Sequence, residues 1–296
     1  MRTTCIALVL AILGCGSGFV PPGTAQDKAA LQPRAGEVIE AIKTEVGIPW
    51  RAETVDTFKA GDPETRVTGI AVTMMATMDV LQRAVAKGDN LIITHEPTFY
   101  NHVDVPDGIA ESDAVWKDKR DYIAAHHLVV WRFHDHWHIR NPDGILTGMV
   151  KAVGWQKYQT AENSHLFVLP ETSLKALAAD VAKKLDSTVL RVVGDPQMKV
   201  THVAFNPGAG GSIKEMKLLE RDDIEVLMVG ETREWETVEY AADAVSEGKR
   251  KALIVIGHIP SEQAGMDECA EWLRGFVKGP RVDFVQAKQP FWLGKQ

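Results

Sequence analysis

Two short stretches, LIITHEP at residues 91–97 and IVIGHIPSE at residues 254–262, decide how this chain of 296 residues folds. Each begins with an apolar run rich in β-branched residues, which is typical of a strand buried on both faces. Each run ends at a histidine, and a glutamate follows either at once or four residues later. Imidazole and carboxylate groups at the carboxyl end of a strand are suited to metal binding, so the two stretches predict one shared site.

The segments around the first stretch alternate between strand and helix patterns. An apolar run at residues 67–74 predicts a strand, and a helix is expected at residues 79–87 before the strand at 91–94. A second helix is expected at residues 112–125, before a strand at 128–133. This order is typical of an α/β fold with a parallel sheet.

The second half of the chain repeats this order, which predicts two related α/β halves with largely parallel sheets. We expect the first half to cover residues 36–158 and the second to cover residues 159–296. Ligands bind beyond the carboxyl ends of strands in open parallel sheets, so we expect the metal site there, between the halves and completed by the second. The glycine-rich segment at 208–212 lacks the Lys-Ser/Thr ending of a phosphate-binding loop, which favours a plain tight turn.

A third strand end also carries imidazole, because HDHWH follows the expected strand at 128–133. If this segment is extended, His134, His136 and His138 share one face and Asp135 lies on the other. A single histidine after a strand is usually a hydrogen-bonded loop residue, but three strand ends with the same chemistry favour a metal site. Without a nearby thiolate, this chemistry suits Zn, Fe, Mn or Ni rather than a structural cysteine–zinc site.

Composition is that of an ordinary globular protein, with 45% hydrophobic and 25% charged residues and a net charge of −7. No basic stripe stands out, so we expect no nucleic-acid partner. A cut after Ala25 would leave a single cysteine, Cys269, so we expect no internal disulfide. We expect its thiol to be buried.

The first 25 residues predict export to the periplasm or the extracellular space. Their apolar run at 6–13 is too short to span a bilayer, and small residues precede the expected cut before Gln26. The alternative is a lipoprotein signal that ends at Gly14, and only a lipid anchor on Cys15 would then bring the protein to a membrane. Residues 26–35 are expected to form a linker.

The order of these motifs resembles the NIF-three-like family of dinuclear metal-centre proteins, also labelled type 2 homologues of GTP cyclohydrolase I. The resemblance covers about residues 36–276 and rests on the helix–glycine–strand–His–x–Pro unit of residues 79–97, the glycine-rich turn, the strand ending in Gly230-Glu231, and the His-x-x-Ser-Glu element at 258–262. It implies a duplicated α/β fold, a site for two metal ions, and a homo-oligomer in the form of a toroidal hexamer. A small-molecule substrate is compatible with it.

This chain departs from the family's ligand motifs at two places. The first motif is two adjacent histidines followed by proline, and here His95 matches the first whereas Glu96 replaces the second. The middle motif, His-Thr-Asn-Leu-Asp, ends in a ligand aspartate, on which His138 falls, with Asp135 as its rival. The last motif is matched by a histidine and a glutamate at positions 258 and 262.

The exchange keeps three imidazoles and two carboxylates, so the resemblance implies a retained site for two divalent transition-metal ions. The expected ligands are His95, Glu96, His138, His258 and Glu262. We expect His95 and His258 to hold one ion, Glu96 and His138 the other, and Glu262 to bridge them. The predicted function is metal-dependent hydrolysis of an unidentified substrate, and the alternatives are a metal-buffering ring or a scaffold in which the site is structural.

Overall fold

Two mixed sheets of five strands each form the framework of the computed structural model, which describes residues 32–105 and 113–294. The predicted signal sequence and most of the predicted linker lie outside these residues. Within the described part of the chain, no helix is both long enough and apolar enough to cross a membrane.

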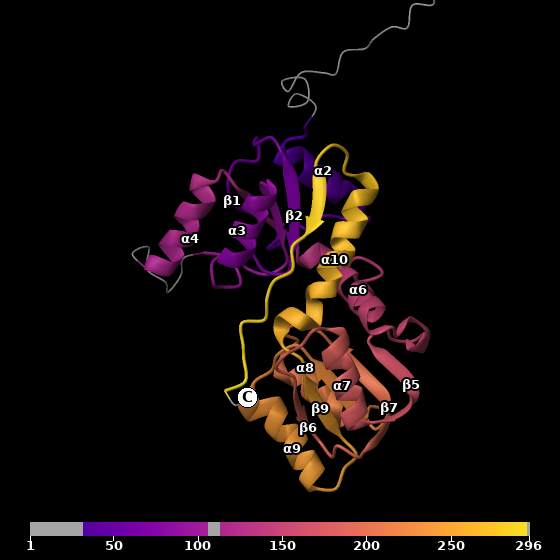
Figure 1. Cartoon of the computed structure of the whole chain (residues 1–296). Helices are drawn as coiled ribbons and strands as arrows, with labels where there is room; N and C mark the ends of the chain where they lie inside the picture. The colour runs from indigo at the N-terminus through magenta and orange to yellow at the C-terminus, as the bar shows by residue number, and fades with distance from the viewer. Residues whose placement is uncertain (1–31, 106–112, 295–296) are drawn as a thin grey trace, which may run out of the picture. The chain divides into compact units, whose positions relative to one another are not determined.

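The first sheet has the strand order β1-β4-β3-β2-β10. Figure 1 shows its last strand in yellow beside β2. The parallel strands β2, β3 and β4 form its centre, as the sequence predicts, and β1 pairs with β4 in the antiparallel direction. The strands are β1 (Phe58–Ala60), β2 (Gly69–Thr73), β3 (Leu91–Thr94), β4 (Val129–Arg132) and β10 (Arg281–Phe284).

Strand β10 comes from the end of the chain and pairs in parallel with β2. The helix before it, α10 (His258–Phe276), also packs against β2 and β10. The last part of the chain therefore returns to the first sheet, which the sequence does not predict. The division into residues 36–158 and 159–296 stays a prediction.

The second sheet has the strand order β5-β7-β8-β9-β6, with β7, β8 and β9 parallel and both edge strands antiparallel. Its strands are β5 (Leu166–Ser173), β6 (Arg191–Val193), β7 (Lys199–Asn206), β8 (Val226–Val229) and β9 (Ala252–Val255). Each sheet thus has a parallel centre, which confirms the predicted α/β class.

The remaining helices connect and cover the strands. They are α2 (Ala35–Glu45), α3 (Met78–Lys87), α4 (Ala114–Ala125), α5 (Asp135–Ile139), α6 (Gly144–Val153), α7 (Leu174–Lys184), α8 (Ser212–Glu220) and α9 (Glu239–Ser246), with short helical turns η1 (Gln156–Tyr158) and η2 (Glu234–Val238). Thr77 caps α3 by accepting from Val80 N, and Gly88 ends the same helix in the left-handed region.

The centre of the second sheet is buried on both faces. Side chains along β8 alternate between two clusters: Val226 and Met228 join the main core, whereas Leu227 and Val229 join a smaller one. This alternation follows from the period of two along a strand and explains why the strand is apolar throughout. Burial of both faces fixes the register, and with it the positions of the polar residues that follow each strand.

Candidate metal centre

The first pair of donors follows β3 directly and is fixed by main-chain hydrogen bonds. His95 N donates to Thr73 O at 3.1 Å, and Glu96 N donates to Met74 O at 2.9 Å. Both side chains are buried. The strand pairing therefore continues through the two residues and holds them at the carboxyl edge of the first sheet.

The histidine cluster after β4 is helical rather than extended, which corrects the predicted alternation. His134 precedes α5, and His138 N donates to His134 O at 3.0 Å, so these two residues lie one turn apart on the same face. His136 points elsewhere: its ring stacks on Trp50 at 3.6 Å between centroids. The cause is Asp56, whose carboxylate accepts hydrogen bonds from the first three main-chain N–H groups of the segment.

The second His–Glu pair begins α10, where His258 and Glu262 are one helical turn apart. Nε2 of His258 lies 3.2 Å from Oε2 of Glu262. Ser261 Oγ accepts from Gly208 N at 3.0 Å, which ties the start of this helix to the loop after β7. That loop is the predicted tight turn, and Gly208 has a φ of +67°.

All five expected ligands come together around the buried carboxylate of Glu262. Its Oε2 lies 3.7 Å from His95 Nε2, and its Oε1 lies 3.6 Å from His138 Nε2. His258 Nε2 lies 3.2 Å from Glu96 Oε1. His95 Nε2 lies 3.2 Å from His138 Nε2. The close pairs are therefore His95 with His138 and Glu96 with His258, whereas we expected His95 with His258.

A sixth candidate metal ligand, His134, belongs to the same cluster. The ligand atoms of His95, His134 and His138 all lie within 4.8 Å of one another, and so do those of His95, Glu96 and Glu262. In the sequence, His134 was one of three candidate histidines. Once the segment is known to be helical, its spacing of four residues from His138 identifies it as the second histidine on the face of the site. Asp135 does not join the cluster, because its carboxylate accepts from Thr54 and Val55 N.

Four histidines of the site present the same ring nitrogen to its centre. The Nδ1 atom of each lies at hydrogen-bond distance from an oxygen outside the donor set, and each Nε2 faces inward. The Nδ1 partners are Phe133 O for His95, Asp135 for His134, Asp143 for His138, and Glu231 for His258. An acceptor on Nδ1 fixes the tautomer with its lone pair on Nε2 and is typical of histidines that bind a metal.

Burial and neighbouring charges shift the pKa values of the site residues in different directions. Burial lowers the pKa of His95 well below its usual value, and burial also lowers the pKa of His134. Burial opposes the charged form of His258, but the carboxylates of Glu231, Glu262 and Glu96 outweigh it and raise the pKa to about 12. Burial would raise the pKa of Glu96, yet the His258 partner and the nearby cations lower it to about 2. The metal-free site therefore holds a charged His258 between carboxylates.

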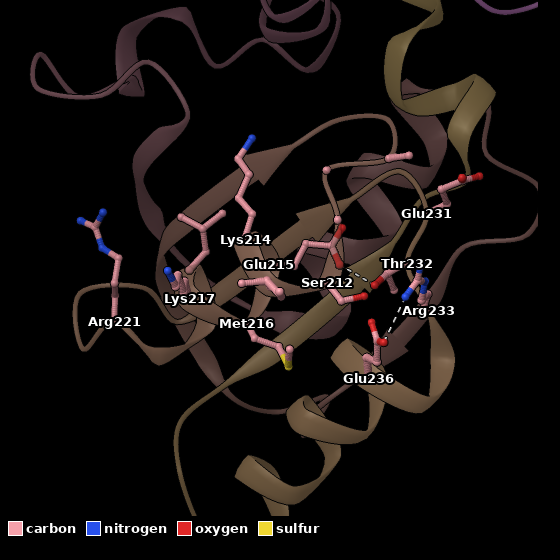
Figure 2. Close-up of a pocket in the computed structure, with 15 residues that line it drawn as sticks. Ser212, Lys214, Glu215, Met216, Lys217, Arg221, Glu231, Thr232, Arg233 and Glu236 are labelled. Atoms are coloured by element: carbon pink, nitrogen blue, oxygen red, sulfur yellow. Dashed lines mark hydrogen bonds and ion pairs between the residues drawn. The ribbon is translucent and has the colours of Figure 1, made fainter. Parts of the chain in front are cut away.

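The donors open into a cavity of about 590 Å³, which Tyr100 and His102 also line. A larger and more open cavity of about 1330 Å³ lies over α8 and shares Ala209 and Glu231 with the first. Figure 2 shows this second cavity, in which Glu215 accepts a hydrogen bond from Thr232 and Arg233 pairs with Glu236 at 3.2 Å. The site thus has room beside it for a small molecule.

The residues present fit divalent transition-metal ions in chemistry and in space. Four imidazoles and two carboxylates without a thiolate suit such ions. A Cβ atom on Gly208 would overlap Oε1 of Glu262, so a side chain at this position would displace the carboxylate. The backbone beside the donors is therefore shaped to the cluster.

Comparisons with known proteins agree with this fold. The model of the Duf34/NIF3 (NGG1p interacting factor 3) family matches residues 37–290. A GTP cyclohydrolase 1 type 2 homolog of Clostridium acetobutylicum is 24% identical over 226 residues, which cover 73% of this chain and 80% of the relative.

Two solved structures share the fold at low sequence identity. A Bacillus cereus protein related to NIF3 superposes with a TM-score of 0.70 and 14% identity, covering 88% of this chain and 99% of its own. A Staphylococcus aureus protein gives a TM-score of 0.67 and 17% identity, with the same coverage of 88% and 99%. The fold class predicted from the sequence is thus confirmed.

Proposed function

The chain belongs to the Duf34/NIF3 (NGG1p interacting factor 3) family, and from this membership and the geometry of the site we propose that it binds two divalent transition-metal ions and hydrolyses a small-molecule substrate. The observation that carries the proposal is the common orientation of four histidines. Each has Nδ1 against an oxygen acceptor and Nε2 turned toward the two buried glutamates. Packing alone does not require four imidazoles from three strand ends to align in this way.

The donors fall into two groups with Glu262 between them. His95, His134 and His138 would hold one ion, and Glu96 and His258 would hold the other. Each oxygen of Glu262 faces a different imidazole of the first group, and Oε2 also faces His258, so its carboxylate would be the ligand that both ions share. When bound, two such ions supply Lewis acidity for hydrolysis.

The protein's own side chains shape the space in which a substrate would react. The smaller cavity is lined by Glu96, His134, His138, His258 and Glu262, and also by Tyr100 and His102. Tyr100 and His102 do not belong to the cluster, and their side chains would contact a substrate bound in this cavity. The shared wall at Ala209 and Glu231 would let a longer substrate extend over α8.

Export and assembly are part of the proposal. The pattern of residues 1–25 supports export, and family membership supports a homo-oligomer of six subunits. An exported protein meets little GTP, so the cyclohydrolase name of the Clostridium relative carries little weight for the substrate.

The test is the metal content of the protein without residues 1–25, together with turnover on a panel of phosphoesters, esters and amides. We expect two ions per chain and turnover that Glu262→Ala abolishes without unfolding the protein. Asp267→Asn is the matched control, because Asp267 is an exposed acid on the same helix. Less than about one ion per chain after metal-replete purification would contradict the two-ion site.

A metal-binding protein without catalysis is the other outcome that the experiment separates. In that case the two ions are present and exchangeable, and no member of the panel is turned over. Ions that stay bound without exchange, again with no turnover, would indicate a structural site in a scaffold.

A further inference from the structure

Arg132, the last residue of β4, is fully buried among the groups that carry the donors although it is not a donor itself. Its Nε donates to His95 O at 2.9 Å, and its Nη1 donates to His102 O. Its Nη2 lies 3.4 Å from Oε2 of Glu96. The guanidinium therefore contacts the main chain on both sides of Glu96 as well as its side chain.

The two oxygens of Glu96 face different surroundings. Oε1 lies 3.2 Å from Nε2 of His258 and 3.8 Å from Nε2 of His134. Oε2 faces Arg132. Glu262 differs, because each of its oxygens lies near an imidazole nitrogen of the cluster. The two glutamates of the site are thus held in different ways.

The charges around Arg132 are balanced inside the protein. Asp104 Oδ2 lies 3.6 Å from Lys59 Nζ and 3.8 Å from Arg132 Nη1. With Glu96, this group has two cations and two anions, and all four side chains are at most 11% exposed. A buried charge without a partner is costly, so the buried guanidinium needs the carboxylates of Glu96 and Asp104 beside it.

We propose that Arg132 is a positioning residue that holds Oε2 of Glu96, so that Glu96 offers a single oxygen to a metal ion and leaves bridging to Glu262. This inference rests on the proposed metal site. A carboxylate with two free oxygens can chelate one ion or bridge two. Arg132 removes that choice, because its rigid fork occupies one oxygen and anchors the main chain of the loop.

The experiment measures cobalt binding by the metal-free protein, with affinity taken from chelator competition and geometry from the visible spectrum. Arg132→Lys keeps a buried cation and loses the planar fork. It is compared with wild type, with Glu96→Ala, and with the double variant. Lys119→Met is the control, since Lys119 is another buried cation that donates to a main-chain carbonyl of the same loop, Thr98 O at 2.6 Å, and does not touch Glu96. Circular dichroism verifies folding, and Arg132→Gln replaces the lysine variant if the latter does not fold.

We expect Arg132→Lys to weaken cobalt affinity by about 10–100-fold and to change the visible spectrum, whereas Lys119→Met changes neither. In the Glu96→Ala background the same substitution should add nothing. Wild-type affinity and spectrum in the Arg132 variant, or an equal loss in both backgrounds, would overturn the positioning role alone. A wild-type chain that binds no cobalt would overturn the proposed function and this inference with it.

Discussion

Nε2 of His95 and Nε2 of His138 lie 3.2 Å apart, although 43 positions separate the two residues in the chain. Two nitrogens that bind the same tetrahedral zinc ion, each at about 2.0–2.1 Å, are about 3.3 Å from each other. The two rings meet edge to face, and each Nδ1 is held by a separate acceptor. The pair is therefore already spaced for one ion.

This spacing favours His138 over Asp135 as the metal ligand. We expect His138→Ala to lose one of the two ions, because it removes one of the three imidazoles that are grouped for that ion. Asp135→Ala should keep both, since its carboxylate faces Thr54 and Val55 N and bonds only the outer nitrogen of His134. Elemental analysis of the two variants measures the number of bound ions. A loss of metal in Asp135→Ala alone would show that Asp135, and not His138, is the ligand.

Metal binding should release protons. The pKa of His258 is raised to about 12 in the metal-free protein, where burial is outweighed by Glu231, Glu262 and Glu96. A metal ion needs the unprotonated Nε2, so binding at neutral pH expels this proton, and affinity rises with pH. The carboxyl of Glu96, with a pKa of about 2, has no proton to lose there.

Calorimetry in two buffers of different ionisation enthalpy counts these protons. We expect at least about one proton per chain at neutral pH. Glu231→Gln removes one of the carboxylates that raise the pKa of His258, so the metal affinity of this variant should stop rising at a lower pH than that of wild type. Zero proton release by wild type would show that His258 is neutral before binding or does not bind.

Gly208→Ala should displace Glu262 and weaken metal binding, because the added methyl group would overlap Oε1. Gly211→Ala is the control in the same loop: its φ is +85° and a Cβ there meets nothing within 4 Å. Both positions have a positive φ, so each alanine variant also carries a backbone cost of about 1–3 kcal/mol. Chelator competition should show a lower metal affinity for Gly208→Ala than for Gly211→Ala. Equal affinities would mean that Glu262 moves aside without an effect on metal binding.

Asp56→Ala should lower the free energy of unfolding by about 2–3 kcal/mol. The variant loses the acceptor of three main-chain N–H groups at the start of α5 and the partner of His136 Nδ1 at 2.7 Å. His134 and His138 depend on this helix, so metal affinity should also fall. Glu53→Ala, an exposed acid in the same loop, is the control for urea denaturation. A change of similar size in both would argue against a special role of Asp56.

The sequence predicted which residues come together better than it predicted the shape of the segments that carry them. The run at 91–94 has its observed bounds, because three apolar residues and a threonine before a polar corner favour a buried strand. The prediction of an extended HDHWH segment was wrong. Its helix is set by the carboxylate of Asp56, which lies 78 to 80 positions earlier in the chain. β10 has few residues and polar ones among them, and its strand state comes from pairing with β2.

The sequence by itself determined the α/β class and the chemistry of the strand ends, because apolar periodicity and residue type are local properties. His95, Glu96, His258 and Glu262 were marked by their place after buried strands. Only the tertiary structure decided which histidines of the third cluster face the site and which oxygen of Glu96 is free. Those choices depend on Asp56 and Arg132, which are distant in the chain or carry no metal-binding pattern, and whose effect comes from contacts that folding creates.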